Sequence, residues 1–293
     1  MVANETTYPT QHERDSREPD TGESHFSTTQ HDGNYAPGNP TPTAYGLVSA
    51  VYDALMAAVP HDAWLRRIET ECARRAKTPR SVLDVACGTG IVSELLVHHG
   101  YYPVVGIDLS APMIRIARTK ADAHNLAEKI TYHVQDAATM DLDAARFDLA
   151  VSLFDSLNYI IDPNDLSKAF VRIAHHLNPG AVLAFDVNSL YALSHDLFTQ
   201  TGASGPLSHV WKSHWDRESR TCRVEMDFTL TGEKTGEPRQ FHETHVQRAY
   251  TITELREMLE AAGFVNISVY GNYGERTPGP KSDRLFFACE MRG

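Results

Sequence analysis

The hydrophobic pattern of residues 81–187 alternates between short apolar runs and amphipathic stretches. The apolar runs are typical of strands buried on both faces, and they cover residues 82–86, 104–108, 130–134, 147–154 and 181–187. Between them, apolar residues recur with helical spacing at 91–99, 112–125 and 166–177. A chain that alternates strand and helix builds a parallel sheet with right-handed crossovers. The pattern therefore predicts an α/β fold with a doubly wound sheet.

Helical and strand patterns also flank this region. Apolar stripes predict two helices before the first strand and one near the end of the chain, at 45–59, 61–76 and 251–262. The last helix begins with a capping box made by Thr251 and Glu254. Two final strands, joined by a loop rich in Gly and Pro, are predicted at 265–270 and 284–291.

Between residues 188 and 250 the period of the pattern changes to two. Alternating apolar and polar residues mark three runs, at 209–216, 222–230 and 239–250. In the middle run every second residue from Cys222 to Leu230 is apolar, which is typical of a half-buried antiparallel strand. We expect a small antiparallel sheet, inserted at 189–250 and placed as a substrate cover over the carboxyl edge of the main sheet.

Residues 1–42 are rich in Thr, Ser, Asp, Glu, Gly, Pro and Asn, and their few aromatic residues show no period. Such a segment buries too little apolar surface to offset the entropy lost on ordering. It is predicted to be a disordered tail, either dispensable or ordered over the site when a ligand binds. The rest divides into a core with cap helices at 43–188, the insertion at 189–250, and a helix and β-hairpin that complete the core at 251–293.

Composition narrows the class of partner. The chain has 293 residues, a net charge of -11 and no block of Lys or Arg, so binding to a nucleic-acid backbone has no electrostatic support. The four cysteines form no CxxC pair and are predicted to be reduced packing residues. No apolar segment is long enough for a signal peptide or a membrane span. These features predict a cytoplasmic protein with neither a nucleic-acid nor a membrane partner.

The stretch from Ser81 to Gly90, SVLDVACGTG, joins the first strand to a glycine turn and a helix. Small residues in such a turn let a ligand lie against the backbone, and the helix N-terminus offers free N–H groups. The second strand ends in Asp108, and in a doubly wound sheet that end lies beside the first turn. Asp108 can then accept hydrogen bonds from both ribose hydroxyls, which predicts an adenosine ligand.

The details of the turn favour one kind of adenosine ligand. A dinucleotide site carries GxGxxG, but Ser93 occupies the third glycine position here. Asp84 would repel a pyrophosphate, whereas a ligand with an ammonium and a sulfonium would suit it, and S-adenosylmethionine is such a ligand. The LDVACGTG motif and the strand ending in Asp108 resemble the first two motifs of the class I S-adenosylmethionine-dependent methyltransferases. A dehydrogenase is the alternative.

The resemblance implies a Rossmann-like, seven-stranded, mostly parallel sheet with helices on both faces and a final antiparallel hairpin. It also implies that Asp136, at the end of the third strand, accepts from the adenine amine, with the Ala137 amide nearby; the alternative is a solvated loop acid. Met113 either packs on the adenine face or is an ordinary helix residue. The implied cofactor-binding set is Asp84, Ala86, Gly88, Gly90, Asp108, Leu109, Met113, Asp136, Ala137 and Phe154.

The fourth strand runs into the sequence FDSLNY, at the end of the sheet that faces the transferred methyl group in this family. Nucleic-acid and protein amino-methyltransferases usually carry (Asn/Asp)-Pro-Pro-aromatic there, so FDSLNY resembles small-molecule methyltransferases instead. Asp155 is a candidate to bind or orient an acceptor amine, unless it caps a helix. Asn158 and Tyr159 are candidates to hydrogen-bond the acceptor or a lid. Tyr45 and Tyr52 are either lid residues at the substrate site or core aromatics.

The third run of the insertion, FHETHVQRAY, is unusually polar. On a strand, Glu243 and His245 point one way, and His242 and Arg248 the other. Such a strand can line a pocket, and we predict His245 as a general base, with Glu243 and Arg248 in the substrate site. The alternative is an exposed, solvated strand. A metal site is not expected, because the alternation separates His242 from the other two possible ligands.

These features together predict an enzyme that moves a methyl group from S-adenosylmethionine to a nitrogen or oxygen of a small molecule by in-line displacement. The product of the cofactor would be S-adenosylhomocysteine. A cofactor-binding regulatory protein of the same fold, without turnover, is the alternative from another functional class. We expect a monomer or a homodimer.

Overall fold

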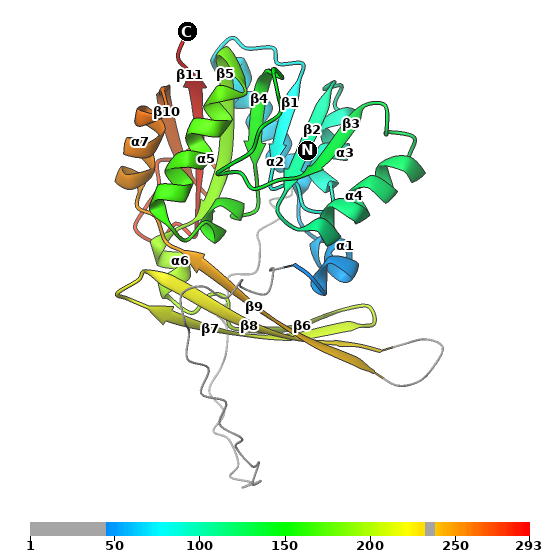
Figure 1. Cartoon of the computed structure of the whole chain (residues 1–293). Helices are drawn as coiled ribbons and strands as arrows, with labels where there is room; N and C mark the ends of the chain where they lie inside the picture. Colours follow the sequence, from blue (N-terminus) through cyan, green and yellow to red (C-terminus); the bar gives the residue numbers. More distant parts are fainter. Residues whose placement is uncertain (1–44, 232–237) are drawn as a thin grey trace, which may run out of the picture. The chain divides into compact units, whose positions relative to one another are not determined.

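The computed structural model describes residues 45–231 and 238–293, so the predicted tail at 1–42 lies outside the described residues. Its main sheet has seven strands in the order β10-β11-β5-β4-β1-β2-β3 (Figure 1). All are parallel except β11, which pairs antiparallel with both β5 and β10. Their bounds are β1 (Val82–Val85), β2 (Val104–Asp108), β3 (Ile130–Val134), β4 (Phe147–Ser152), β5 (Leu177–Asn188), β10 (Phe264–Gly271) and β11 (Arg284–Met291). The predicted mostly parallel sheet is confirmed.

Helices cover both faces of this sheet because successive strand residues point to opposite sides. The helices are α2 (His61–Arg74), α3 (Ile91–His98), α4 (Ala111–Ala123), α5 (Pro163–His175) and α7 (Ile252–Ala261). On β1, Leu83 belongs to a hydrophobic cluster with residues of α5 and α7, whereas its neighbour Val82 belongs to a second cluster with residues of α2, α3 and α4. The four cysteines are free and buried, as predicted.

Local signals set most element ends. Ser110 caps α4, and the capping box of Thr251 and Glu254 at α7 is present in full. Two expectations need correction. The predicted helix at 45–59 is a 3₁₀ turn, η1 (Val48–Val51), followed by the short helix α1 (Tyr52–Met56). Residues 178–180 lie in β5, where the pairing with β4 is irregular, so the strand begins earlier than the apolar run.

The insertion forms a separate four-stranded antiparallel sheet in the order β6-β7-β8-β9. Its elements are α6 (Leu190–Ser194), β6 (Gln200–Ser204), β7 (Leu207–Asp216), β8 (Thr221–Leu230) and β9 (Arg239–Arg248). The strand β6 escaped prediction because its sequence, QTGAS, has no apolar alternation. One face of the sheet is buried on a hydrophobic cluster that contains Val224 and Phe228 from β8. The cluster also contains Val48 from residues 45–56, which we call the cap segment.

The second sheet meets the carboxyl ends of the main strands through β9 (Figure 1). Asn188, the last residue of β5, donates to Gln247 Oε1 (2.9 Å). Asn158, in the 3₁₀ turn η2 (Ser156–Tyr159) after β4, donates to the Arg248 carbonyl (2.8 Å). The second sheet therefore lies at the carboxyl edge, as predicted, while its role as a substrate cover stays a prediction. Within the described residues, each helix is too short or too polar to cross a bilayer.

A substitution at Gly90, which lies at the start of α3, would test how tightly the glycine turn after β1 is packed. Its φ of +81° is left-handed, and an added Cβ would collide with Tyr132 Oη and lie 3.2 Å from Ala117 Cβ. We expect Gly90→Ala to lower the free energy of unfolding by about 1–2 kcal/mol for the left-handed φ and by a further amount of about 1–3 kcal/mol for overpacking.

Gly100→Ala is the matched control, because Gly100 has a φ of +93° but open space where the Cβ would lie. It should show only the conformational part of the loss. Denaturant unfolding measures both variants, and equal losses would contradict the packing argument.

Candidate functional site

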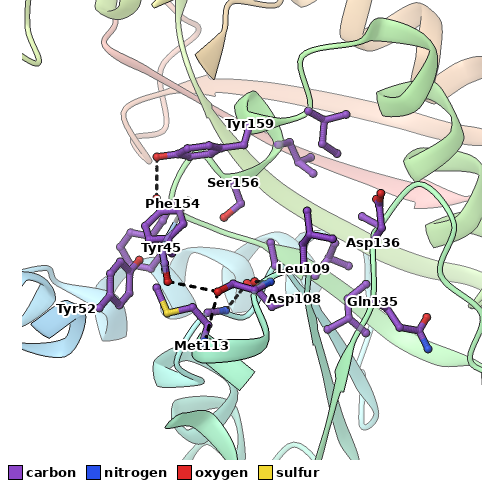
Figure 2. A pocket seen from close by; sticks show the side chains of 18 residues that line it. Tyr45, Tyr52, Asp108, Leu109, Met113, Gln135, Asp136, Phe154, Ser156 and Tyr159 are labelled. Atoms are coloured by element: carbon purple, nitrogen blue, oxygen red, sulfur yellow. Dashed lines mark hydrogen bonds between the residues drawn. The ribbon is translucent and has the colours of Figure 1, made fainter. Parts of the chain in front are cut away.

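A cavity lies at the carboxyl ends of β1, β2 and β4, and we call it the main cavity (Figure 2). Its volume, including the open mouth, is about 960 Å³. In Figure 2, three tyrosines and Phe154 lie toward one side, and Gln135 and Asp136 toward the other. The lining residues are Tyr45, Tyr52, Val85, Ala86, Gly88, Ile107, Asp108, Leu109, Ser110, Met113, Gln135, Asp136, Ala137, Phe154, Ser156, Leu157, Tyr159 and Ile160.

Eight of the ten residues predicted to bind the cofactor line this cavity: Ala86, Gly88, Asp108, Leu109, Met113, Asp136, Ala137 and Phe154. Gly88 has a φ of +55°, which a residue with a side chain rarely adopts, and its missing Cβ leaves the backbone open to the cavity. Gly90 is not among the lining residues of either cavity described here. The structure shows instead that Tyr132 packs closely against it, and its predicted ligand contact stays a prediction.

Asp108, at the end of β2, binds the backbone of the glycine turn after β1. Its Oδ1 accepts from the Ser110 amide (2.7 Å) and its Oδ2 from the Gly88 amide (2.8 Å). Burial raises the pKa of this carboxyl, and the two amides oppose the rise. Each carboxylate oxygen has further lone pairs, so Asp108 can still accept from a ligand with two adjacent hydroxyls.

A smaller cavity adjoins the main one and shares Ala86, Gly88 and Phe154 in its lining. Asp84 lines it, with Oδ2 accepting from Ser93 Oγ (2.6 Å). Burial raises the pKa of Asp84 to about 7.

His61 also lines the smaller cavity. Its Nδ1 donates to the Val59 carbonyl (2.8 Å), and burial lowers the pKa of the His61 imidazole. Among the described residues, His61 Nε2 is buried without a hydrogen-bond partner, so it is free to accept from a ligand.

Three tyrosines, Tyr45, Tyr52 and Tyr159, build one end of the main cavity. Tyr45 packs edge-on against Tyr52 and donates to Tyr159 Oη (2.8 Å). Tyr159 Oη lies 2.9 Å from His245 Nδ1, and His245 Nε2 lies 2.9 Å from Glu243 Oε2. His245 and Glu243 are absent from the cavity lining and reach it only through Tyr159, so their predicted roles at the substrate stay predictions.

Glu243 also fastens the cap segment over the cavity. Its carboxylate accepts from the backbone amides of Tyr45 (3.0 Å), Leu47 (2.6 Å) and Val48 (2.9 Å). Although burial raises the pKa of Glu243, the hydrogen bonds from His245 and from the Val48 and Leu47 amides hold it below the ordinary value. Glu243 is therefore ionised at neutral pH, and it fixes the position of Tyr45.

Asp155 lies behind the wall of the cavity and does not line it. Its carboxylate accepts from Arg284 Nη2 (2.8 Å) and Gln247 Nε2 (2.5 Å). Burial raises its pKa, which the Arg284 charge opposes and the Asp186 charge reinforces. The structure places Asp155 in a buried ion pair, and it makes no side-chain cap at η2; its predicted contact with an acceptor amine stays a prediction.

Asn158 and Arg248 lie outside the cavity as well. Asn158 is fully buried, and its amide spans the Asn188 N–H (2.8 Å) and the Arg248 carbonyl (2.8 Å). The Arg248 guanidinium stacks over Tyr250 and pairs with Glu254 (3.4 Å), because Arg248 is on the opposite face of β9 from His245. The structure thus gives both residues partners within the protein, away from the main cavity, and their predicted substrate contacts stay untested.

Several lining residues escaped prediction. Ser156 and Gln135 follow β4 and β3, in segments where site residues were predicted, but serine and glutamine are not residue types that by themselves indicate a function. His61 had no sequence signal at all, because a histidine at a helix start is usually a surface residue. Only the packing of α2 beside the glycine turn brings its ring into the smaller cavity.

Comparison with known proteins agrees with this geometry. A family model described as a methyltransferase domain matches residues 82–180. The chain is 31% identical over 248 residues to the putative methyltransferase YqeM of Bacillus subtilis (strain 168), covering 84% of this chain and 96% of that protein. The chain belongs to the class I S-adenosylmethionine-dependent methyltransferases.

Two further comparisons support the assignment. A solved S-adenosylmethionine-dependent methyltransferase from Clostridium acetobutylicum ATCC 824 aligns with a TM-score of 0.75 at 26% identity, covering 85% of this methyltransferase and 99% of that chain. The dTDP-3-amino-3,4,6-trideoxy-alpha-D-glucopyranose N,N-dimethyltransferase of Streptomyces venezuelae is 30% identical over 198 residues, covering 64% of this chain and 78% of that protein.

The residues present fit S-adenosylmethionine, the cofactor of this family. Aspartates and aromatic rings line the two cavities, and among the described residues that line them there is neither a lysine nor an arginine. Such a lining suits a ligand that carries a sulfonium and an ammonium, since carboxylates and aromatic faces attract cations. The free acceptor at His61 Nε2 adds a partner for an N–H group.

The raised pKa of Asp84 predicts a pH-dependent stability of the cofactor-free protein. Because its folded pKa is about 7 rather than the ordinary 3.8, its contribution to stability is present below about pH 4 and is lost as the pH rises to about 7. Asp84→Asn should remove this dependence. The free energy of unfolding of wild type relative to the variant should fall by up to about 1.4 kcal/mol per pH unit in that window.

Urea unfolding across this pH range measures the effect, with the exposed Asp122→Asn on α4 as the control that keeps the wild-type dependence. Parallel pH profiles for wild type and Asp84→Asn would contradict the prediction.

Asp108→Asn should weaken binding of S-adenosylhomocysteine. An amide has one acceptor oxygen where the carboxylate has two, and a hydrogen bond to a charged group contributes about 1.5–3 kcal/mol, which corresponds to about tenfold or more in affinity. Calorimetric titration of wild type, Asp108→Asn and the Asp122→Asn control gives the three affinities. Unchanged affinity in Asp108→Asn, or preferential binding of NAD by wild type, would contradict the assigned role of Asp108.

Proposed function

We propose that this methyltransferase transfers the methyl group of S-adenosylmethionine to a nitrogen or oxygen atom of a small molecule, with an amine nitrogen as the first choice. The observation that carries the proposal is the acceptor end of the main cavity, where Tyr45 and Tyr159 present phenol groups under β9. A phenol oxygen can accept a hydrogen bond from the N–H of an amine or the O–H of an alcohol while its own proton is donated within the protein.

The size and cover of the site support a small acceptor. The main cavity contains predicted cofactor-binding residues at one side and the phenols of Tyr45 and Tyr159 at the other, so one small site can receive a cofactor and a compact acceptor. The cap segment and β9 are tied together by Glu243 at the acceptor end. The net charge of -11 also disfavours a nucleic-acid substrate.

The relative from Streptomyces venezuelae supports nitrogen over oxygen, because it is named as an N,N-dimethyltransferase of an amino sugar. The dTDP-linked part of that relative's substrate does not fit the main cavity of this methyltransferase. A diphosphate is usually paired with Lys or Arg, and the described lining of the main cavity contains neither. An amine without a phosphate group is the acceptor class that this lining supports.

Roles for the cofactor-binding residues follow from their positions. Asp108 would accept from the ribose hydroxyls, Asp136 and the Ala137 amide would bind the adenine amine, and Asp84 and His61 would bind the aminoacyl end. When bound, S-adenosylmethionine supplies an electrophilic methyl group on a sulfonium. Phe154 stands where the two cavities join and would exclude water from that point.

The protein's main catalytic task is then to align the acceptor with the methyl group. Fixed orientation of two reactants can lower a barrier by about 7–11 kcal/mol. Tyr45 and Tyr159 are suited to this task because both are anchored: Tyr45 by Glu243 through its amide, and Tyr159 by His245 through its hydroxyl.

The test is a panel of alkyl amines, amino sugars without phosphate, phenols and aliphatic alcohols, incubated with the enzyme and S-adenosylmethionine. Mass spectrometry should show a methyl adduct on at least one amine, together with S-adenosylhomocysteine. Asp108→Asn is the control for cofactor-dependent turnover. Tight S-adenosylhomocysteine binding with no methylated product on the whole panel would instead favour a cofactor-binding regulator, and methylation of phenols alone would move the acceptor to oxygen.

A further inference from the structure

A continuous chain of hydrogen bonds leads from the acceptor end of the main cavity into the second sheet. Tyr159 lines the cavity at one end of this chain, and Glu243 on β9 ends it. His245 stands between them and is only 2% exposed. Tyr159, His245 and Glu243 come from η2 and β9, so only the packing of the second sheet on the main one creates the path.

The direction of each hydrogen bond follows from the ionised Glu243. A carboxylate only accepts, so His245 Nε2 carries the proton in the pair with Glu243 Oε2. In the neutral imidazole Nδ1 is then the acceptor, and Tyr159 donates to it. Tyr159 Oη receives one hydrogen bond, from Tyr45, and keeps a second lone pair for a ligand. Every link can thus pass a proton away from the cavity.

The surroundings of the path decide which group can hold that proton. Burial and the Asp155 charge raise the pKa of Tyr159, and burial with its tyrosine neighbours raises the pKa of Tyr45. Neither phenol is therefore stable as a phenolate at neutral pH. The groups that face His245 are Glu243 from its own strand, Tyr159 from η2 and Tyr45 from the cap segment. The His245 imidazole lies between Tyr159 and the ionised Glu243, with one ring nitrogen on each, and is therefore placed to receive a proton from Tyr159.

We propose that Tyr159, His245 and Glu243 form a proton-accepting relay, and that the acceptor of this methyltransferase enters the site carrying an N–H or O–H proton that it must lose. This inference rests on the proposed function. Tyr159 is the residue that contacts the acceptor. His245 and Glu243 act through Tyr159 and are positioning residues.

The proton and electron balance closes within the site. An alkylammonium or hydroxyl acceptor gives a proton to Tyr159 Oη, while the Tyr159 proton moves to His245 Nδ1. The freed lone pair of the acceptor forms the bond to the methyl carbon, and the pair of the broken sulfur–carbon bond stays on sulfur. The resulting imidazolium is held by Glu243 and releases its proton to solvent after turnover. No further reactant is required.

The proton arrangement is tested without turnover. In the complex of the full-length protein with S-adenosylhomocysteine at neutral pH, ¹⁵N NMR of labelled histidine should show His245 protonated on Nε2 and unprotonated on Nδ1. His245→Asn assigns the signal, and Tyr159→Phe should shift the Nδ1 resonance because it removes the donor. A proton on Nδ1, or on both nitrogens, would overturn the relay.

The kinetic consequence is tested on an alkyl amine that the acceptor panel identifies. Tyr159→Phe and His245→Asn should lower kcat by about 10²–10⁴-fold, the usual contribution of acid–base catalysis, with a smaller change in KM and the same affinity for S-adenosylhomocysteine. An imidazole that is already doubly protonated cannot accept the relayed proton, so the relay predicts that kcat of the wild type falls at acid pH and that this fall disappears in His245→Asn. A pyridine nitrogen, which enters without a proton, should be methylated equally by wild type and variants.

His242→Asn is the matched control, because His242 lies on the same strand with its ring exposed and paired with Asp227 on the opposite face. It should keep the wild-type kcat and pH profile. A wild-type kcat and pH profile in His245→Asn would overturn the relay and leave the proposed function intact. Absence of product on the whole panel would contradict the proposed function, while the NMR result would still decide the proton arrangement.

Discussion

The buried contact of Arg284 with Asp186 and Asp155 is the interaction on which the rest of the site depends. Asp186, near the end of β5, is fully buried and accepts from the backbone amides of Phe154 (2.8 Å) and Asp155 (2.9 Å). Both of those residues have left-handed φ angles, which cost free energy unless the surroundings impose them. Arg284 on β11 supplies the charge that keeps the two carboxylates together in a medium of low dielectric.

This ion group connects the edge of the sheet to the ligand site. Tyr273, in the loop after β10, donates to Asp186 (2.6 Å) and stacks on Trp64 of α2 with ring centroids 4.5 Å apart. Trp64 in turn packs against Phe154, which lines both cavities. The reversed strand β11 and its loop therefore determine where the wall of the cavity stands, although neither lines the cavity.

Two carboxylates hold the cap segment over the opposite side of the site. Glu243 takes three backbone amides at residues 45–48, and Asp53 on α1 binds Thr89 Oγ1 (2.5 Å) and Lys120 Nζ (2.6 Å). The second sheet thus does more than lie at the carboxyl edge. Through Glu243 and His245 it sets the positions of the Tyr45 and Tyr159 phenols, so the geometry of that end of the main cavity depends on an element inserted late in the chain.

The sequence by itself determined the parts whose causes are local. The apolar pattern, the helix caps and the glycine turn were enough to predict the parallel sheet. The position of Asp108 at the ligand site could also be predicted, because in such a sheet the end of β2 must lie beside that turn. The roles of His245, Asp155, Asn158 and Arg248 were decided only by tertiary structure. A polar side chain on an alternating strand or in a turn has the same sequence signal whether it meets a ligand, another carboxylate or a backbone amide. Which of these it meets depends on the element packed against it, and here that element comes from a distant part of the chain.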